Sequence, residues 1–110
     1  MFDFDKFLNM LTDDMKAVVR EHAAGFGKEV TKDSLEFAEN MKDDIERWTG
    51  QLARGELDRE DFEWLLAAKK DLAEMKALKM KGLAQVRIDR IRNALVQTII
   101  GSAIKAAGIG

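Results

Sequence analysis

The feature that most constrains this chain is a heptad spacing of apolar side chains. In residues 3–24 the core-type positions recur in steps of 4, 3, 4, 3 and 4, and the same steps return in residues 31–54. Side chains spaced in this way share one face of an α-helix, which packs along a neighbouring helix. The spacing therefore predicts two long helices whose core faces are Phe4, Leu8, Leu11, Met15, Val18 and His22 in the first, and Ser34, Ala38, Met41, Ile45, Trp48 and Leu52 in the second.

The composition agrees with long helices and few turns. The chain has 110 residues and no proline, and 35% of its residues are charged while 46% are hydrophobic. Proline interrupts helices, and a high charge beside an ordinary apolar fraction is typical of amphipathic helices. Gly25, Gly27 and Gly55 mark the expected turns. We expect one domain over residues 1–110, because this length suits a single small core.

A third helical segment is predicted over about residues 58–107. Asp58 and Asp61 have the spacing of a capping box, in which each side chain accepts a hydrogen bond from the other residue's backbone. The apolar stripe of Leu65, Ala68, Leu72 and Met75 does not continue in register into the stripe after Gly82, which is Ala84, Ile88, Ile91, Leu95 and Ile99. The segment is thus either one long helix with two faces or two helices broken near Gly82. We favour the single helix, since one glycine costs a helix only about 1 kcal/mol.

These elements predict an all-α fold. An antiparallel hairpin of the first two helices packs along a long C-terminal helix, as in a coiled-coil-like bundle of three to four helices. Trp48 lies on the predicted core stripe, whereas Trp64 lies near the third stripe but not on it.

The residues that enzymes use are scarce. Cysteine is absent and His22 is the only histidine, so neither a thiolate nor a two-histidine metal site can form within one chain. Glu36, Glu39, Asp43 and Glu46 line one helix face, which is interpreted as a solvated acidic face rather than a cation site. No phosphate-binding glycine motif is present. We therefore expect no catalytic activity and no cofactor or metal.

The charge is divided unevenly along the chain. Residues 1–68 carry 17 acidic and 9 basic side chains, whereas residues 69–110 carry 3 acidic and 9 basic ones. The favoured interpretation is that the acidic hairpin packs beside the basic segment, in the same chain or in a neighbouring one. Nucleic-acid binding is not favoured, because the basic residues 69–92 lack interleaved aromatic side chains.

The C-terminal residues 94–110 are unusually apolar, with Lys105 as their single charge. Following the basic stretch 69–92, they are compatible either with burial against protein, which we favour, or with a membrane surface. The N-terminus does not have the form of a secretory signal and no uncharged apolar run reaches 18 residues. The expected location is cytoplasmic.

A straight third helix would extend beyond the hairpin and leave its C-terminal apolar face uncovered. Uncovered faces of this kind mark interfaces, so we expect a non-catalytic interaction or assembly protein that forms a homo-oligomer through its C-terminal helix; another protein partner is also compatible. The alternative function is membrane association, and a monomer with the tail folded back onto the hairpin is the alternative structure if Gly82 breaks the helix. The expected interface residues are Ile88, Ile91, Leu95, Ile99, Ile100 and Ile104.

Overall fold

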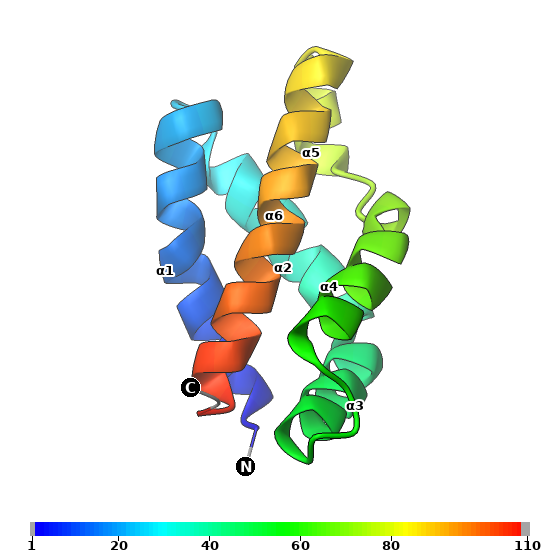
Figure 1. Cartoon of the computed structure of the whole chain (residues 1–110). Helices are drawn as coiled ribbons and strands as arrows, with labels where there is room; N and C mark the ends of the chain where they lie inside the picture. The colour runs from blue at the N-terminus through cyan, green and yellow to red at the C-terminus, as the bar shows by residue number, and fades with distance from the viewer. Residues whose placement is uncertain (1, 109–110) are drawn as a thin grey trace.

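The structure is a computed structural model that describes residues 2–108. In this part of the chain every regular element is helical, which confirms the all-α class. Figure 1 shows the C-terminal helix between two flanking helices. The elements are α1 (Phe4–His22), α2 (Gly27–Asn40), α3 (Lys42–Ala53), α4 (Arg59–Ala68), a short 3-10 helix (Lys70–Leu72), α5 (Lys76–Met80) and α6 (Gln85–Ala106).

The first helix agrees closely with its prediction. Asp3 caps α1 by accepting a hydrogen bond from the backbone N–H of Lys6 at 3.2 Å. The helix stops before Gly25, which has a φ of 90° that glycine adopts without strain. Its buried side chains are Phe7, Leu11, Met15 and Val18.

The second predicted helix, residues 31–54, is two helices. α2 starts earlier, at Gly27, and the chain changes direction at Met41 before α3 (Figure 1). The Met41 N–H is shared between the carbonyl oxygens of Phe37 and Ala38, at 3.0 and 3.2 Å. The bend therefore leaves this amide hydrogen-bonded and lets both helices keep their apolar faces on the core. The predicted stripe is buried along both, through Ala38, Met41, Ile45 and Trp48.

The favoured single helix over residues 58–107 is wrong. The capping box is present, with the Asp61 N–H donating to the Asp58 carboxylate at 2.8 Å and the Asp58 N–H donating to the Asp61 carboxylate at 3.4 Å. The chain then leaves the α-helical path after Ala68 and again at Gly82, where φ is 78°. A straight helix of that length would measure about 75 Å, whereas the longest dimension of the molecule is 42 Å.

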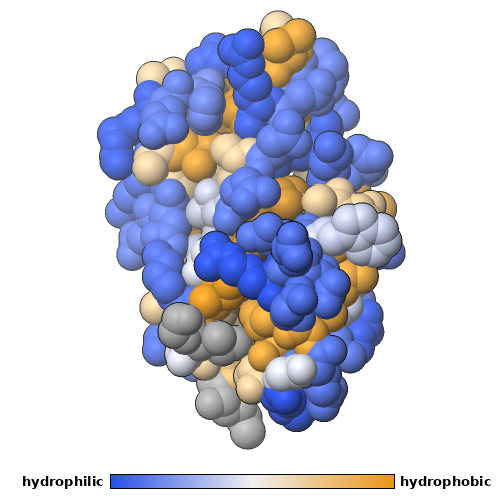
Figure 2. All heavy atoms as spheres, viewed as in Figure 1, coloured by the Kyte–Doolittle hydropathy of each residue, from blue (hydrophilic) through white to orange (hydrophobic). Residues whose placement is uncertain are grey.

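The break allows α6 to fold back and become the centre of the core. It runs antiparallel to α1, with both ends of the described chain at the same end of the molecule (Figure 1). α6 packs most extensively on α1 and also contacts α3 and α4. Figure 2 shows the result, a face with mainly hydrophilic side chains and separate smaller hydrophobic areas. The buried residues of α6 are Ile88, Ile91, Leu95, Val96, Ile99, Ile100, Ser102, Ala103 and Ala106.

Candidate functional site: exposed surfaces

The predicted interface residues of the C-terminal helix lie mainly inside the molecule. Five of them, Ile88, Ile91, Leu95, Ile99 and Ile100, are at most 1% exposed, and Ile104 is partly buried. Their prediction assumed a straight third helix with an uncovered apolar face. Because α6 folds back onto the hairpin, α1 and its neighbours cover that face, and these five side chains cannot reach a partner in this fold.

Most apolar side chains of residues 94–108 are enclosed for the same reason. Ser102 and Lys105 connect this segment to α1, since the Ser102 hydroxyl donates to the Asp14 carboxylate at 2.6 Å and the Lys105 ammonium lies 2.9 Å from it. Within residues 2–108, none of the helices combines the length and the hydropathy needed to cross a bilayer. The last two residues of the predicted tail, 109 and 110, lie outside the described part.

His22 lies at the end of α1, half-buried beside an open cavity. Its Nε2 atom is 3.7 Å from the Glu21 carboxylate, and its backbone carbonyl accepts a hydrogen bond from Arg87 Nε at 2.9 Å. Arg87 also lies over the ring of Phe26, 5.3 Å from its centre. The residues that line the cavity offer no hydroxyl or thiol group to the imidazole. The contacts of His22 and Arg87 therefore join the start of α6 to the end of α1.

The four carboxylates of the predicted acidic face, Glu36, Glu39, Asp43 and Glu46, are all exposed. Over residues 2–108 the structure brings together no group of three His, Cys, Asp or Glu side chains that could hold a metal ion. The face therefore lies in solvent across α2 and α3.

Few ion pairs join the acidic half of the chain to the basic half, although the sequence predicts that the two pack together. In the described part of the chain, two ion pairs join residues 1–68 to residues 69–110: Asp14 with Lys105, and Glu29 with Lys81 at 3.9 Å. The other ion pairs are local, such as Asp44 with Arg47. Most basic side chains of residues 69–92 consequently face solvent rather than the acidic hairpin.

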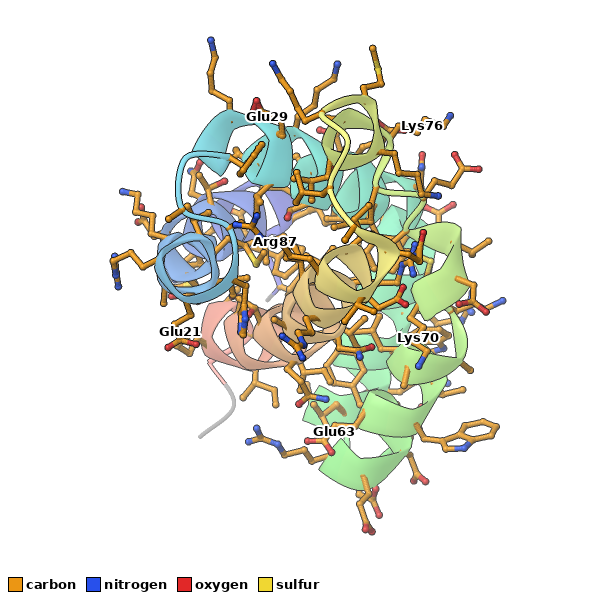
Figure 3. The ribbon with its side chains drawn as sticks, turned by 90° about the horizontal axis from the view of Figure 1, so that it is seen from above. Glu21, Glu29, Glu63, Lys70, Lys76 and Arg87 are labelled. Carbon is orange, nitrogen blue, oxygen red and sulfur yellow. The ribbon has the colours of Figure 1, made fainter. Side chains whose placement is uncertain are left out.

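A group of lysines gathers where α5 packs on α2, and Figure 3 views the molecule from this end. We call this region the α5 tip. The exposed side chain of Met80, 87% accessible, projects among the lysines. An open groove of about 440 Å³ lies here, lined mainly by residues of α2 and α5. The residues of the α5 tip are Lys28, Lys32, Lys76, Lys79, Met80 and Lys81.

A second surface lies on α4, at one side of the molecule (Figure 1). Trp64 is 71% exposed, and the exposed residues Ala67 and Ala68 follow it by three and four positions, which places all three on one side of the helix. We call these three residues the Trp64 face. The sequence pattern places Trp64 off the core stripe, and none of the sequence-based interface predictions includes it. The available signal was a large aromatic side chain outside the stripe.

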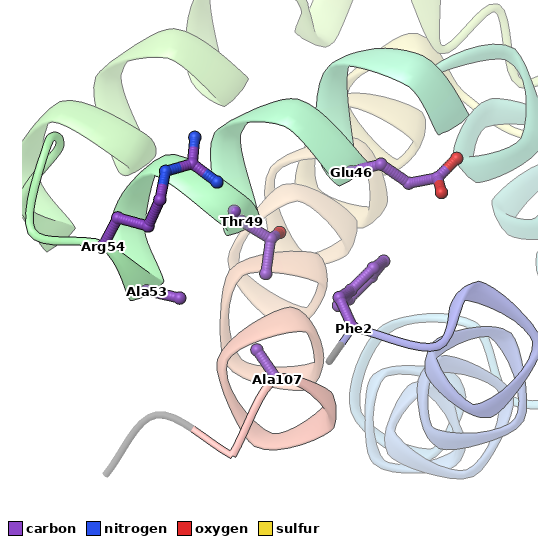
Figure 4. Close-up of a pocket in the computed structure, with 7 residues that line it drawn as sticks. Phe2, Glu46, Thr49, Ala53, Arg54 and Ala107 are labelled. Atoms are coloured by element: carbon purple, nitrogen blue, oxygen red, sulfur yellow. The ribbon is translucent and has the colours of Figure 1, made fainter.

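A third hollow lies between α3 and the ends of the described chain, with space for about 430 Å³. Its lining includes Phe2, Thr49 and Ala107 (Figure 4). The Thr49 side chain is buried, and its hydroxyl has no hydrogen-bond partner among residues 2–108. Figure 4 shows Arg54 and Glu46 on opposite sides of the hollow, and the Arg54 guanidinium already pairs with Glu56 at 2.9 Å. The two charged side chains that line the hollow among residues 2–108 therefore lie apart from each other.

Comparisons of the chain with models of protein families, with curated proteins and with solved structures find no match.

Proposed function

We propose that this chain is a non-catalytic assembly module that forms a homodimer through the Trp64 face. The observation that carries the proposal is the exposure of Trp64, 71% of whose surface meets solvent on the side of a regular helix. Tryptophan is enriched among the few residues that contribute most of the binding free energy at interfaces. An indole exposed to this extent gains from burial against a partner.

The Trp64 face has the shape that a symmetric pair requires. In a two-fold dimer the same patch is used twice, so it must contain both a protruding group and the space that receives it. Trp64 supplies the protruding ring, and the small side chains of Ala67 and Ala68 leave room one turn away. Two antiparallel copies of α4 place each indole over the alanines of the other copy.

Charge along α4 supports the antiparallel arrangement. Its first turn carries the exposed acidic residues Glu60 and Asp61, whereas Lys69 and Lys70 follow its last turn, with Asp71 as the one acidic neighbour there. Antiparallel packing brings the acidic turn of one copy toward the lysines of the other. Complementary charges of this kind favour one orientation and speed association.

The non-catalytic part of the proposal is supported by the surroundings of the candidate groups. The cavity beside His22 is lined without a hydroxyl or thiol group, and the hollow beside Thr49 separates its two charged residues. General acid–base and nucleophilic catalysis both need such groups within hydrogen-bond reach of one another.

The test is the molar mass in solution, measured by sedimentation equilibrium over a range of protein concentrations. The full chain should approach twice its monomer mass of 12.4 kDa. Trp64→Ala should raise the dissociation constant about 100-fold, as removal of a central interface residue does. Ala68→Glu should have a similar effect, because it fills the space that receives the indole and adds a charge.

Two control variants separate the Trp64 face from general changes of the surface. Ala17→Glu also places a carboxylate at an exposed alanine of a helix, and Val86→Ala shortens a side chain that is 64% exposed on α6. Both should keep the mass of the full chain. A full chain that stays monomeric at its highest attainable concentration, or a dimer that is indifferent to both Trp64→Ala and Ala68→Glu, would refute the proposal.

A further inference from the structure

The α5 tip concentrates positive charge, and carboxylates of the described residues pair with only part of it. Of its five lysines, Lys76 pairs with Glu74 at 2.9 Å and Lys81 with Glu29 at 3.9 Å. The other three, Lys28, Lys32 and Lys79, form no ion pair with any residue in the described part of the chain. Glu36 is the remaining carboxylate of the groove. Three ammonium groups from two packed helices thus extend into solvent at one end of the molecule.

The α5 tip also exposes an apolar side chain that lies outside the core. Met80 is 87% exposed at the last residue of α5, between Lys79 and Lys81, whereas its neighbour Leu78 is fully buried. The groove beside Met80 is lined by Lys28, Lys32 and Lys76 as well as Ala77. A flexible, unbranched apolar chain surrounded by lysines matches the two zones of a bilayer surface, where anionic headgroups lie above acyl chains.

We propose that the α5 tip docks onto anionic phospholipid bilayers, with its lysines at the headgroup phosphates and the Met80 side chain in the interfacial layer. Nucleic acid fits the tip less well, because the tip lacks the aromatic rings that stack on bases. Free phosphate would pair with the lysines but would leave Met80 in water. The apolar tail of residues 94–108 takes no part in this docking, since α6 lies in the core.

The distribution of charge orients the molecule on such a surface. Figure 1 places α5 at one end of the molecule and the turn between α3 and α4 at the other. Residues 69–92 carry eight basic and three acidic side chains, whereas residues 37–68 carry nine acidic and four basic ones. An anionic surface attracts the first group and repels the second, and so favours contact through the tip.

This docking is independent of the proposed dimer, because the Trp64 face and the α5 tip share no residue. Binding can therefore be measured in the wild type and in Trp64→Ala. If the mass measurement shows no dimer, the vesicle experiment still tests the lipid proposal separately.

The experiment is co-sedimentation of the full chain with vesicles of phosphatidylcholine, with and without phosphatidylserine, at low salt. The chain should bind only the vesicles that contain phosphatidylserine. Each lysine at an anionic surface strengthens partitioning about fivefold. The double variant Lys28→Glu/Lys79→Glu should therefore weaken partitioning at least about 25-fold.

The matched control is Lys6→Glu/Lys16→Glu, which changes the net charge equally at exposed lysines of α1. It should retain most of the binding. Met80→Ser keeps the charge and should weaken partitioning about fivefold to tenfold, as loss of one apolar side chain from the interface does. Circular dichroism melts confirm that each variant is folded.

Three results would overturn the inference. The first is no binding to phosphatidylserine vesicles. The second is an equal loss in both double variants, which would reveal only a response to net charge. The third is an unchanged Met80→Ser variant together with equally strong binding to a short DNA duplex, which would identify a general polyanion surface.

Discussion

At the scale of single residues, Asp33 holds α5 in place. This carboxylate lies on α2 and is only 4% exposed, and it accepts hydrogen bonds from the backbone N–H groups of Ala77 and Leu78 at 2.9 and 3.0 Å. These amides belong to the first turn of α5, where a helix has no internal acceptors for them. The Asp33 side chain of α2 thus supplies the hydrogen-bond acceptors that the first turn of α5 lacks.

Replacing Asp33 should destabilise the fold in a graded way. Asp33→Ala leaves two amides without acceptors and should lower the free energy of unfolding by about 2–3 kcal/mol, whereas Asp33→Asn keeps one acceptor and should cost about half as much. Urea unfolding followed by circular dichroism measures both. Glu36→Ala, an exposed carboxylate of the same helix, should change the stability by less than about 0.5 kcal/mol. Equal effects of Asp33→Ala and Glu36→Ala would contradict the assigned role.

Asp14 should make the stability of the protein vary with pH in the acidic range. Its partial burial acts to raise the pKa of the carboxyl, but the hydrogen bond from Ser102 and the ammonium of Lys105 outweigh burial and hold the pKa below its ordinary value. A group whose pKa is lower in the folded state binds protons more readily when unfolded. Its contribution to stability is therefore present above about pH 4 and is lost as the pH falls through the folded-state pKa.

The expected outcome is a pH-dependent difference between the wild type and Asp14→Asn. Near neutral pH the wild type should have the higher Tm, and the difference should shrink as the pH is lowered below about 4. Thermal melts at several pH values measure it. A difference that stays constant down to about pH 2 would show that the charge of Asp14 does not contribute.

At the scale of elements, two glycines have opposite roles. Gly82 ends the α5 region with a φ of 78°, a conformation that strains any residue with a Cβ, although a Cβ there would meet no atom within 4 Å. Gly101 lies inside α6, outside the positive-φ region, and a Cβ there would also meet open space. The two sites therefore differ in backbone conformation and not in steric room.

Alanine at these two sites should change stability with opposite signs. Gly82→Ala should destabilise the protein by about 1 kcal/mol because of the positive φ, and Gly101→Ala should stabilise it by about 0.5–1 kcal/mol because alanine favours the helix. The midpoints of chemical unfolding report both. Destabilisation by Gly101→Ala would show that its outer surface packs against something, such as a second copy.

The break at Met75 shows how packing can oppose local preference. Met75 has a φ of 56°, in the left-handed region, yet its side chain is only 2% exposed. The left-handed backbone costs about 1–2 kcal/mol, whereas complete burial of a methionine contributes about 1.5–3 kcal/mol. Burial of the Met75 side chain therefore offsets the strain of its left-handed backbone.

At the scale of the whole molecule, α6 is the element on which the fold depends. α6 packs on α1, α3, α4 and the 3-10 helix. Removal of α6 would therefore expose the apolar side chains of these elements to water. A chain that ends at Gly82 should therefore lack a cooperative thermal transition, rather than persist as a folded hairpin. Circular dichroism melts of the full and shortened chains compare the two. A sharp transition in the shortened chain would contradict the central position of α6.

The predictions from sequence succeed where the interactions are local. The limits of α1 follow from a cap three residues away and a glycine at its end, and the capping box of α4 depends on two residues of one turn. Most core positions of α1, α2 and α3 also follow, because helical periodicity sets which side chains share a face. The predicted positions Phe4, Leu8, His22 and Leu52 are only partly buried, and Phe7 and Phe37, which lie beside the predicted stripes, are buried. The role of Asp33 was missed because its partners lie 44 and 45 residues further along the chain.

The candidate surfaces were predicted less well. The interface assigned to α6 depended on the choice of a continuous third helix, and the broken alternative encloses most of those residues. Trp64 and Met80 are candidates because of their exposed fractions, which depend on the tertiary structure. An apolar stripe in the sequence identifies the apolar face of a helix, but it does not identify which other element covers that face.

The sequence by itself determined that this chain is helical, where α1 lies, where α4 begins and which side chains of the first helices are apolar toward the core. Only the tertiary structure decided the bend at Met41, the reversal between Met75 and Gly82 and the position of α6 against α1. The physical reason is the balance of magnitudes. Local preferences differ by about 1 kcal/mol per residue, while burial of the α6 isoleucines and leucine contributes about 1.5–3 kcal/mol for each side chain. The fold in which α6 is buried is therefore more stable than one in which residues 58–107 form a single straight helix.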